Sequence, residues 1–282
     1  MCIRDRYSTP VQTKDFTFDL NINLSRNVSK VKELADGVDY LFFNGDANFP
    51  INVGTRVGHR LGEIYAKNLY KRDENGNMIV NKQGRPTKVS GEDAFQYTLD
   101  HPIGNIEPDL LMSVSPSFTY KGFTLSALFD MKFGGDIVSV SEAMATSTGL
   151  AARTANRGNA ENGWKIVAPG VTADGTVNST AMNAQRYYTS MSGMAEEFVY
   201  DASFIKLKEL SLGYSFPKSI LKKTPLTSLN VAFVARNLAY LMKHTPRTSP
   251  EGGYDTSMFS QAIDYMSVPY TRTFGLSINL GF

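Results

Sequence analysis

The chain has 282 residues, of which 42% are hydrophobic and 20% are charged, and its formal net charge is only +2. This balance excludes the strong electrostatic attraction to nucleic acid that a basic chain would have. The single cysteine, Cys2, excludes a disulfide framework within the chain. The sequence has no run of about eighteen apolar residues, so it predicts no transmembrane helix. Strands that cross a membrane alternate apolar and polar residues, so their average hydropathy is like that of a soluble protein.

The first six residues, MCIRDR, do not begin a secretory signal peptide, because no apolar region follows them. They are similar to the translated adapter sequence that often opens reading frames from metagenomic assemblies. We therefore interpret residues 1–6 as a sequencing or assembly artefact and leave them out of the fold prediction. We also expect that an N-terminal part of the protein is missing.

Alternation of apolar and polar residues recurs along the rest of the chain, which predicts β-strands with one apolar face. The predicted strands lie near residues 14–26, 58–70, 109–120, 122–133, 203–216, 228–241 and 270–282. The weakest is GHRLGEIYAKNLY at 58–70, where Gly62 and Lys67 break the pattern. Most of the others have about ten residues or a little more, the length that a tilted strand needs to cross a bilayer.

The strands near 109–120 and 122–133 are joined by Lys121 and Gly122 alone, which predicts a β-hairpin. Helix signals are sparse: residues 137–157 are rich in Ala and Ser and could be partly helical, and PKSILKK at 217–223 could make one turn. The sequence thus predicts an all-β fold of about seven antiparallel strands.

The last predicted strand has the clearest alternation. Gly and Ser occupy much of its other face, where a strand exposed to water usually has Lys, Glu and Thr. Its apolar residues are Phe274, Leu276, Ile278, Leu280 and Phe282. We expect these five residues to face lipid and to act as a membrane insertion signal.

The connections between the predicted strands differ in length. Long ones are predicted near 71–108, 134–202 and 242–269, with a tight turn at 121–122 and a short link at 217–227. Outer-membrane barrels have long extracellular loops and short periplasmic turns. The linker at 27–57 is too long for this scheme. A soluble β-sandwich, which also alternates, stays open as the alternative.

Candidate binding residues are few. Trp164, Tyr187 and Tyr188 lie in the longest predicted loop and could stack on sugar rings or on peptide side chains, although most aromatic residues in loops only pack the loop. Lys206 and Lys208 could form an anion site, but we favour a solvated strand end, with the long side chains reaching the interface.

No catalytic residue, metal ligand set or cofactor site is predicted. His59, His101 and His244 are far apart in sequence and fit no metal-ligand spacing. Nucleotide-binding glycine motifs and nucleophile motifs do not occur. Residues 73–77, DENGN, include ligand types that calcium prefers, but their spacing is wrong for an EF-hand and favours a plain turn.

Several segments resemble a known family. YDASFIKLKELSLGYSFPKSILKKTPLTSLNVAFVARNL (200–238) is similar to a segment near the end of SusC/RagA-type, TonB-dependent outer-membrane transporters of Bacteroidetes. EPDLLMSVSPSFTYKGFTLSALFDMKFGGDIV (107–138) resembles a hairpin of that family, and TFGLSINLGF fits its closing strand. Pro116 departs from the family pattern and, because proline cannot donate to a ladder, predicts a local bulge.

The resemblance implies that residues 7–282 are the C-terminal portion of a transmembrane β-barrel of roughly 22 strands, which an N-terminal plug domain fills. Alone, the chain would form an open meander. The implied function is energy-coupled import of oligosaccharides or peptides across the cell outer membrane. The implied partners are a SusD-like surface lipoprotein and, through the missing N-terminal part, the TonB–ExbB–ExbD complex. The alternative is a soluble or secreted β-rich glycan-binding module.

Overall fold

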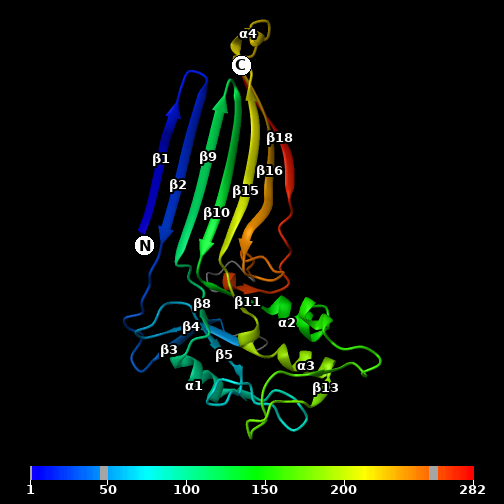
Figure 1. Ribbon diagram of the computed structural model, residues 1–282. Helices are drawn as coiled ribbons and strands as arrows, with labels where there is room; N and C mark the ends of the chain where they lie inside the picture. Colours follow the sequence, from blue (N-terminus) through cyan, green and yellow to red (C-terminus); the bar gives the residue numbers. More distant parts are fainter. Residues whose placement is uncertain (1, 45–49, 254–259) are drawn as a thin grey trace.

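A computed structural model describes residues 2–44, 50–253 and 260–282. Its largest element is one seven-stranded antiparallel sheet (Figure 1). The strands, in spatial order, are β1 (Cys2–Gln12), β2 (Phe16–Arg26), β9 (Leu110–Tyr120), β10 (Phe123–Phe133), β15 (Phe204–Ser215), β16 (Ser228–Lys243) and β18 (Thr273–Gly281). Each long strand pairs with the next one along the chain, so the sheet is an open meander whose edges are β1 and β18.

The register gathers the apolar residues on one face of the sheet, because directly opposed residues in an antiparallel pair point to the same side. One row of opposed residues crosses six strands. It consists of Phe18, Phe118, Leu125, Leu212, Phe233 and Leu276. The rings of Phe18 and Phe118 stack with their centroids 4.6 Å apart. We call this side the apolar face.

The other side of the sheet, the polar face, has small and charged residues. Asp19, Ser117, Ser126 and Ser211 oppose one another across four strands. Ion pairs also join neighbouring strands: Lys208 Nζ lies 2.6 Å from Asp130 Oδ2, and Arg236 Nε lies 2.7 Å from Glu209 Oε2.

The apolar face is bare. Phe233 is 51% exposed and Leu276 is 67% exposed, although both are large hydrophobic residues. Within the described ranges no second sheet pairs with or covers these strands (Figure 1). The β-sandwich alternative is therefore wrong, because a sandwich would bury its apolar face against another sheet.

One predicted strand is not part of the large sheet. Residues 58–70 form β5 (Glu63–Ala66) and β6 (Asn68–Tyr70), which belong to two smaller sheets. All four residues of β5 are buried, so this segment is a short core strand without an exposed face. β2 instead pairs directly with β9, and the seventh strand of the large sheet is β1 at its edge, which includes most of the residues that the fold prediction left out.

The structure removes the objection raised by the 27–57 linker. That linker and residues 58–109 form one long connection from β2 to β9. Short links at 13–15, 121–122 and 216–227 now lie at one end of the sheet, and the long connections lie at the other (Figure 1). The long connections and the short links therefore alternate regularly between the two ends of the sheet, as predicted. The bulge at Pro116 is wrong: Pro116 opposes Leu20 without a shift in register.

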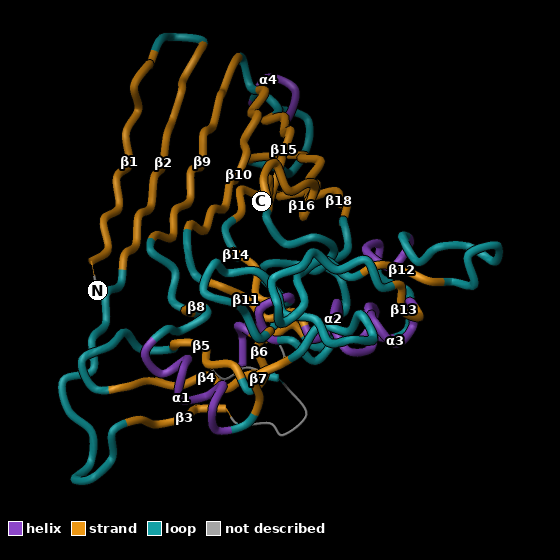
Figure 2. The backbone as a smooth tube through the Cα atoms, turned by 60° about the horizontal axis from the view of Figure 1, so that its bottom comes forward, coloured by secondary structure: helices purple, strands orange, loops and turns teal. Residues whose placement is uncertain are grey.

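The three long connections fold together into what we call the loop body, residues 27–109, 134–203 and 244–272, of which 45–49 and 254–259 lie outside the described residues (Figure 2). Its strands are β3 (Tyr40–Asn44), β4 (Ile51–Arg56), β5, β6, β7 (Lys88–Ser90), β8 (Gly104–Asn105), β11 (Asp136–Ser139), β12 (Lys165–Val167), β13 (Ala181–Asn183), β14 (Val199–Asp201) and β17 (Ile263–Asp264). Its helices are α1 (Glu92–Asp100), α2 (Val140–Ser147) and α3 (Ala184–Met191).

Both predicted helical segments are helical in part. α2 begins within 137–157, and its N-cap Ser139 accepts a hydrogen bond from the Glu142 N–H at 3.1 Å, which fixes where the helix starts. α4 (Lys218–Leu221) is the single turn in PKSILKK, between β15 and β16. Among the described residues, no helix is long and apolar enough to cross a membrane.

The buried core of the described chain lies in the loop body. One cluster joins β4, β5 and β11, with Val53 and Ile64 fully buried. A second joins α2, α3 and Phe198, and a third packs Tyr65 against Phe95 and Leu99 of α1. The long connections are therefore a packed unit at one end of the sheet.

Candidate functional site

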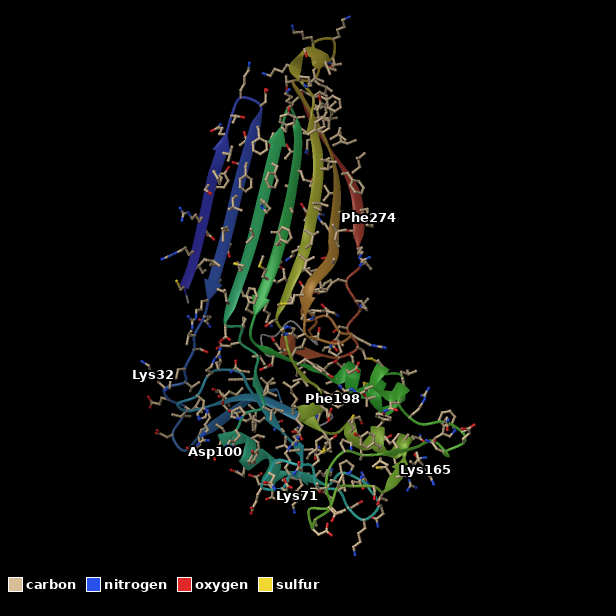
Figure 3. The ribbon with its side chains drawn as sticks, viewed as in Figure 1. Lys32, Lys71, Asp100, Lys165, Phe198 and Phe274 are labelled. Atoms are coloured by element: carbon tan, nitrogen blue, oxygen red, sulfur yellow. The ribbon has the colours of Figure 1, made fainter. Side chains whose placement is uncertain are left out.

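The predicted insertion signal lies on the apolar face at the edge of the sheet. Leu276 opposes Phe233, Ile278 opposes Val231 and Leu280 opposes Leu229 in β16. All five predicted residues are exposed: Phe274 63%, Leu276 67%, Ile278 55%, Leu280 50% and Phe282 82%. Figure 3 shows Phe274 projecting from the sheet, well away from the loop body. Phe274, Leu276, Ile278 and Leu280 share one uncovered apolar stripe of β18, Phe282 follows the strand, and the role of the five residues in insertion stays a prediction.

The loop body is attached to the sheet through Lys206, which is only 3% exposed. Its Nζ lies 2.5 Å from Glu251 Oε2 in the loop body. The same ammonium group lies 5.1 Å from the centroid of the Tyr240 ring and 4.9 Å from that of Tyr270. The solvated strand end expected for Lys206 is therefore wrong. A buried ammonium requires such a partner, because desolvation of an unpaired charge is costly.

The three predicted binding residues have different surroundings. Tyr187 and Tyr188 of α3 are each 7% exposed and belong to the second core cluster. Trp164 is 50% exposed and lies just before β12. Most of the surface of the two tyrosines thus packs the loop body, and Trp164 is the member of the set with a large free surface.

Arg153 holds the surroundings of α3 together. Its guanidinium lies 2.9 Å from Glu197 Oε2, donates to the Tyr200 hydroxyl at 2.8 Å and lies 5.1 Å from the centroid of the Phe198 ring. Its backbone oxygen also accepts from the Tyr188 hydroxyl at 2.9 Å. Sequence reasoning missed Arg153, because no local pattern around it predicts partners more than forty positions away.

Burial sets the protonation of the tyrosines near Arg153. Burial, with a smaller contribution from the Glu197 carboxylate, raises the pKa of Tyr187 to about 12. Burial also raises the pKa of Tyr200 to about 12, against the opposing effect of the Arg153 charge. The raised pKa values move the ionisation of both phenols further from physiological pH, and the Tyr200 hydroxyl accepts the hydrogen bond from Arg153 in its neutral form.

A cavity of about 680 Å³ opens beside Trp164. Tyr188, Arg157 and Thr146 also line it, so it lies between the end of α2, the segment 148–164 and the start of α3. A volume of this size is within the range of ligand pockets, roughly 300–1,000 Å³. Of the three predicted binding residues, the structure brings Trp164 and Tyr188 to this cavity.

The predicted turn at DENGN is confirmed. Asp73 accepts hydrogen bonds from the backbone N–H groups of Asn75 and Asn77, and the Asn77 side chain donates to its other oxygen at 3.0 Å. Within the part of the chain that the structure describes, no group of three or more His, Cys, Asp or Glu residues could hold a metal ion.

The fold and the exposed stripe define a class of protein: the sheet is an open section of β-barrel wall with a folded loop body at one end. No family model matches the chain. It is 27% identical over 98% of its length to TonB-dependent receptor P3 of Formosa agariphila, and 29% identical over 73% of its length to TonB-dependent receptor SusC of Bacteroides thetaiotaomicron. It spans 28% and 19% of the length of these two relatives.

Solved structures of similar fold include those of the RagAB peptide transporter. One, the RagAB peptide transporter itself, has a TM-score of 0.64 at 18% identity, and the likeness covers 99% of this chain and 28% of that one. The "open-open" state of the RagAB peptide importer has a TM-score of 0.63. The chain is therefore similar in sequence to TonB-dependent receptors, and its fold resembles a section of the RagAB transporter.

Proposed function

We propose that this chain is part of an outer-membrane transporter that imports oligosaccharides or peptides, with energy supplied through TonB. The observation that carries the proposal is the bare apolar face, which spans six strands of the sheet and includes Phe118, Leu125 and Phe233. A face of this kind is stable next to lipid and unstable in water, because apolar surface exposed to water is unfavourable.

The polar face and the loop body support a role in transport. In a plugged barrel the polar face lines the lumen, where ion pairs such as Lys208–Asp130 meet water. The loop body would lie at the extracellular mouth, because the short links mark the periplasmic end. A packed loop body can present a defined surface to a nutrient, whereas a loop without packed structure could not.

The proposal extends to partners and to the rest of the protein. A SusD-like surface lipoprotein would close over the loop body, and the TonB–ExbB–ExbD complex would act through a plug domain encoded elsewhere in the full-length protein. We also propose that residues 1–6 are not part of the native protein. Arg4 and Arg6 oppose Leu24 and Ile22, which places two charges on the apolar face where lipid would lie.

Membrane extraction and substrate uptake distinguish an outer-membrane transporter from a soluble glycan-binding module. Membranes from the native bacterium should retain the full-length protein through high-salt and carbonate washes and release it only into detergent. Deletion of its gene should abolish uptake of at least one oligosaccharide or peptide too large for porins and leave monosaccharide uptake unchanged. Release of the protein without detergent would contradict the proposal and favour the soluble module, whose glycan binding would then be measured directly.

A further inference from the structure

The cavity beside Trp164 contains a buried hydroxyl group with an unmet hydrogen bond. Thr146 of α2 is 0% exposed, lines the cavity, and its Oγ1 has no partner among the described residues. A threonine inside a helix usually bonds back to a carbonyl one turn earlier. Buried polar groups are nearly always hydrogen-bonded, and leaving one unpaired costs about 1–3 kcal/mol. The unpaired hydroxyl therefore indicates a ligand that supplies the partner.

Trp164 has a strained backbone at the same cavity. Its φ is 56°, in the left-handed region that bulky residues rarely adopt. Two backbone bonds hold it there: its N–H donates to Asn159 O at 2.8 Å, and its carbonyl accepts from the Ala184 N–H at 3.0 Å. The second bond ties the tryptophan to the first residue of α3. Strain of this kind persists where the surroundings enforce it and concentrates at ligand sites.

The charge of the cavity has one sign. Arg157 lines it, and its one recorded bond is a long contact of 3.3 Å to the Gly149 carbonyl oxygen. No Asp or Glu within the described ranges lines the same cavity. The remaining polar lining is neutral, with Thr148, Asn183 and Gln185 at the wall. An anionic group therefore meets a cation here and no competing carboxylate.

Aromatic surface, neutral polar groups and one cation together describe the ligand. Trp164 offers a half-exposed ring on which the C–H face of a sugar can lie, while the Thr146 hydroxyl and the Gln185 amide can bond ring hydroxyls. We propose that this cavity is a subsite for a carboxylated sugar ring, with Trp164 below the ring, Thr146 bonded to a hydroxyl and Arg157 paired with the carboxylate. This inference rests on the proposed function, because it names the cargo that the loop body would contact.

The chain contains a single tryptophan, so Trp164 reports on its own site. The full chain, folded in detergent micelles and checked by circular dichroism, is titrated with trigalacturonate, maltotriose or trialanine. We expect a saturable shift of the tryptophan emission to shorter wavelength with trigalacturonate. Maltotriose should bind about tenfold more weakly because it lacks the charge-assisted pair. Trialanine should give no saturable change.

Three variants assign the roles. Thr146→Val keeps the shape of the side chain and removes the hydroxyl, so trigalacturonate should bind about two- to tenfold more weakly with no loss of thermal stability. Arg157→Gln should remove the preference for trigalacturonate over maltotriose. Arg186→Gln, on α3 but lining a different cavity, is the matched control and should change neither. A Thr146→Val variant that binds like the parent chain would overturn the role of the hydroxyl.

The remaining outcomes are decisive. Trialanine binding as tightly as trigalacturonate would make the cavity a peptide subsite and contradict the proposal, as would a folded chain whose emission responds to neither saccharide. Failure of the proposed function has a different signature, because the native protein would then leave the membrane fraction without detergent. A protein that is integral to the membrane, supports uptake and yet shows a flat titration would refute the subsite alone.

Discussion

The large sheet and the loop body use hydrophobic residues in opposite ways. In the sheet, residues such as Phe233 and Leu276 are more than half exposed. In the loop body, Val53, Ile64 and Phe198 are fully buried, although this region consists of the connections between the long strands. Figure 3 shows both, with Phe274 on the sheet and Phe198 inside the loop body.

Under the proposed function, the two regions fold against different solvents. The loop body buries its apolar side chains as a water-soluble domain does, so its stability comes from packing. The sheet is held by backbone ladders and leaves its apolar side chains outward, which is stable only where lipid replaces water. Substitutions of the same kind should therefore have different effects in the two regions.

The largest effect is expected from truncating the core of the loop body. Phe198→Ala removes a fully buried ring that packs beside Arg153, and the cavity left behind should cost about 3–5 kcal/mol. Amide hydrogen exchange of the chain in micelles should become much faster in β11 and β14 and stay unchanged in β15 and β16. Phe233→Ala, on the sheet, is the control and should have little effect, because detergent or lipid fills its place. Equal loss of protection in both regions would show that they are one packing unit.

A charge on the apolar face should have the next largest effect. Phe129 lies near the middle of β10, opposite Val114 and Leu207. Phe129→Lys should lower the free energy of unfolding in lipid by about 2–4 kcal/mol, measured by urea titration of the membrane-inserted protein. Ser113→Lys is the matched control, because Ser113 opposes Asp130 on the polar face. If the two lysine variants are equally stable, the apolar face does not meet lipid.

Alternation predicted the sheet well, because the period of two is a direct consequence of strand geometry. Six of the seven long strands were found in this way. β1 was missed because residues 1–6 were left out of the prediction as an artefact and because Arg4 and Arg6 break its alternation. Residues 58–70 were misplaced because β5 is buried on both sides. Periodicity identifies a strand that has one apolar and one polar face, and neither of these two segments has that pattern.

The candidate site was predicted only in part. Composition and loop position drew attention to Trp164, Tyr187 and Tyr188, but no sequence pattern distinguishes a tyrosine that packs a loop from one that lines a cavity. Thr146 was missed for the same reason, since its importance lies in a partner that it lacks. Contacts such as Arg153–Glu197 form between distant segments once the loop body packs.

A third test uses pH to separate the loop body from the sheet. Asp136 in β11 accepts from the Asn105 N–H at 2.8 Å, and burial raises the pKa of its carboxyl above the ordinary value of 3.8. A raised pKa means that the protonated form favours folding, so this contribution is full below pH 3.8 and is lost as pH rises through the folded-state pKa. Asp136→Asn should thus make the loop body more resistant to proteolysis at neutral pH and less dependent on pH.

Asp100 supplies the control of opposite sign. Its hydrogen bond from Arg56 lowers the pKa of the Asp100 carboxyl, so its contribution is present above pH 3.8 and is lost as pH falls through the lower folded-state pKa. Asp100→Asn should not improve resistance at neutral pH. A gain from both variants would mean that removing any acidic group stabilises the loop body, and the assignment to Asp136 would be wrong.

The smallest energetic effect is expected at the edge of the sheet, where it tests the insertion signal. Phe282 is 82% exposed next to the end of β18, so Phe282→Asp removes little burial, and a charge near the membrane interface costs at most about 1 kcal/mol. In the full-length transporter, a large drop in folded, heat-modifiable protein in the outer membrane would therefore report a failure of recognition during insertion. Ser277→Asp places the same charge on the polar face of the same strand, since Ser277 opposes Ala232, and should insert normally. Equal amounts of folded protein for Phe282→Asp and the unchanged transporter would show that the apolar stripe of β18 matters for lipid contact alone, and that its last aromatic residue is not read during assembly.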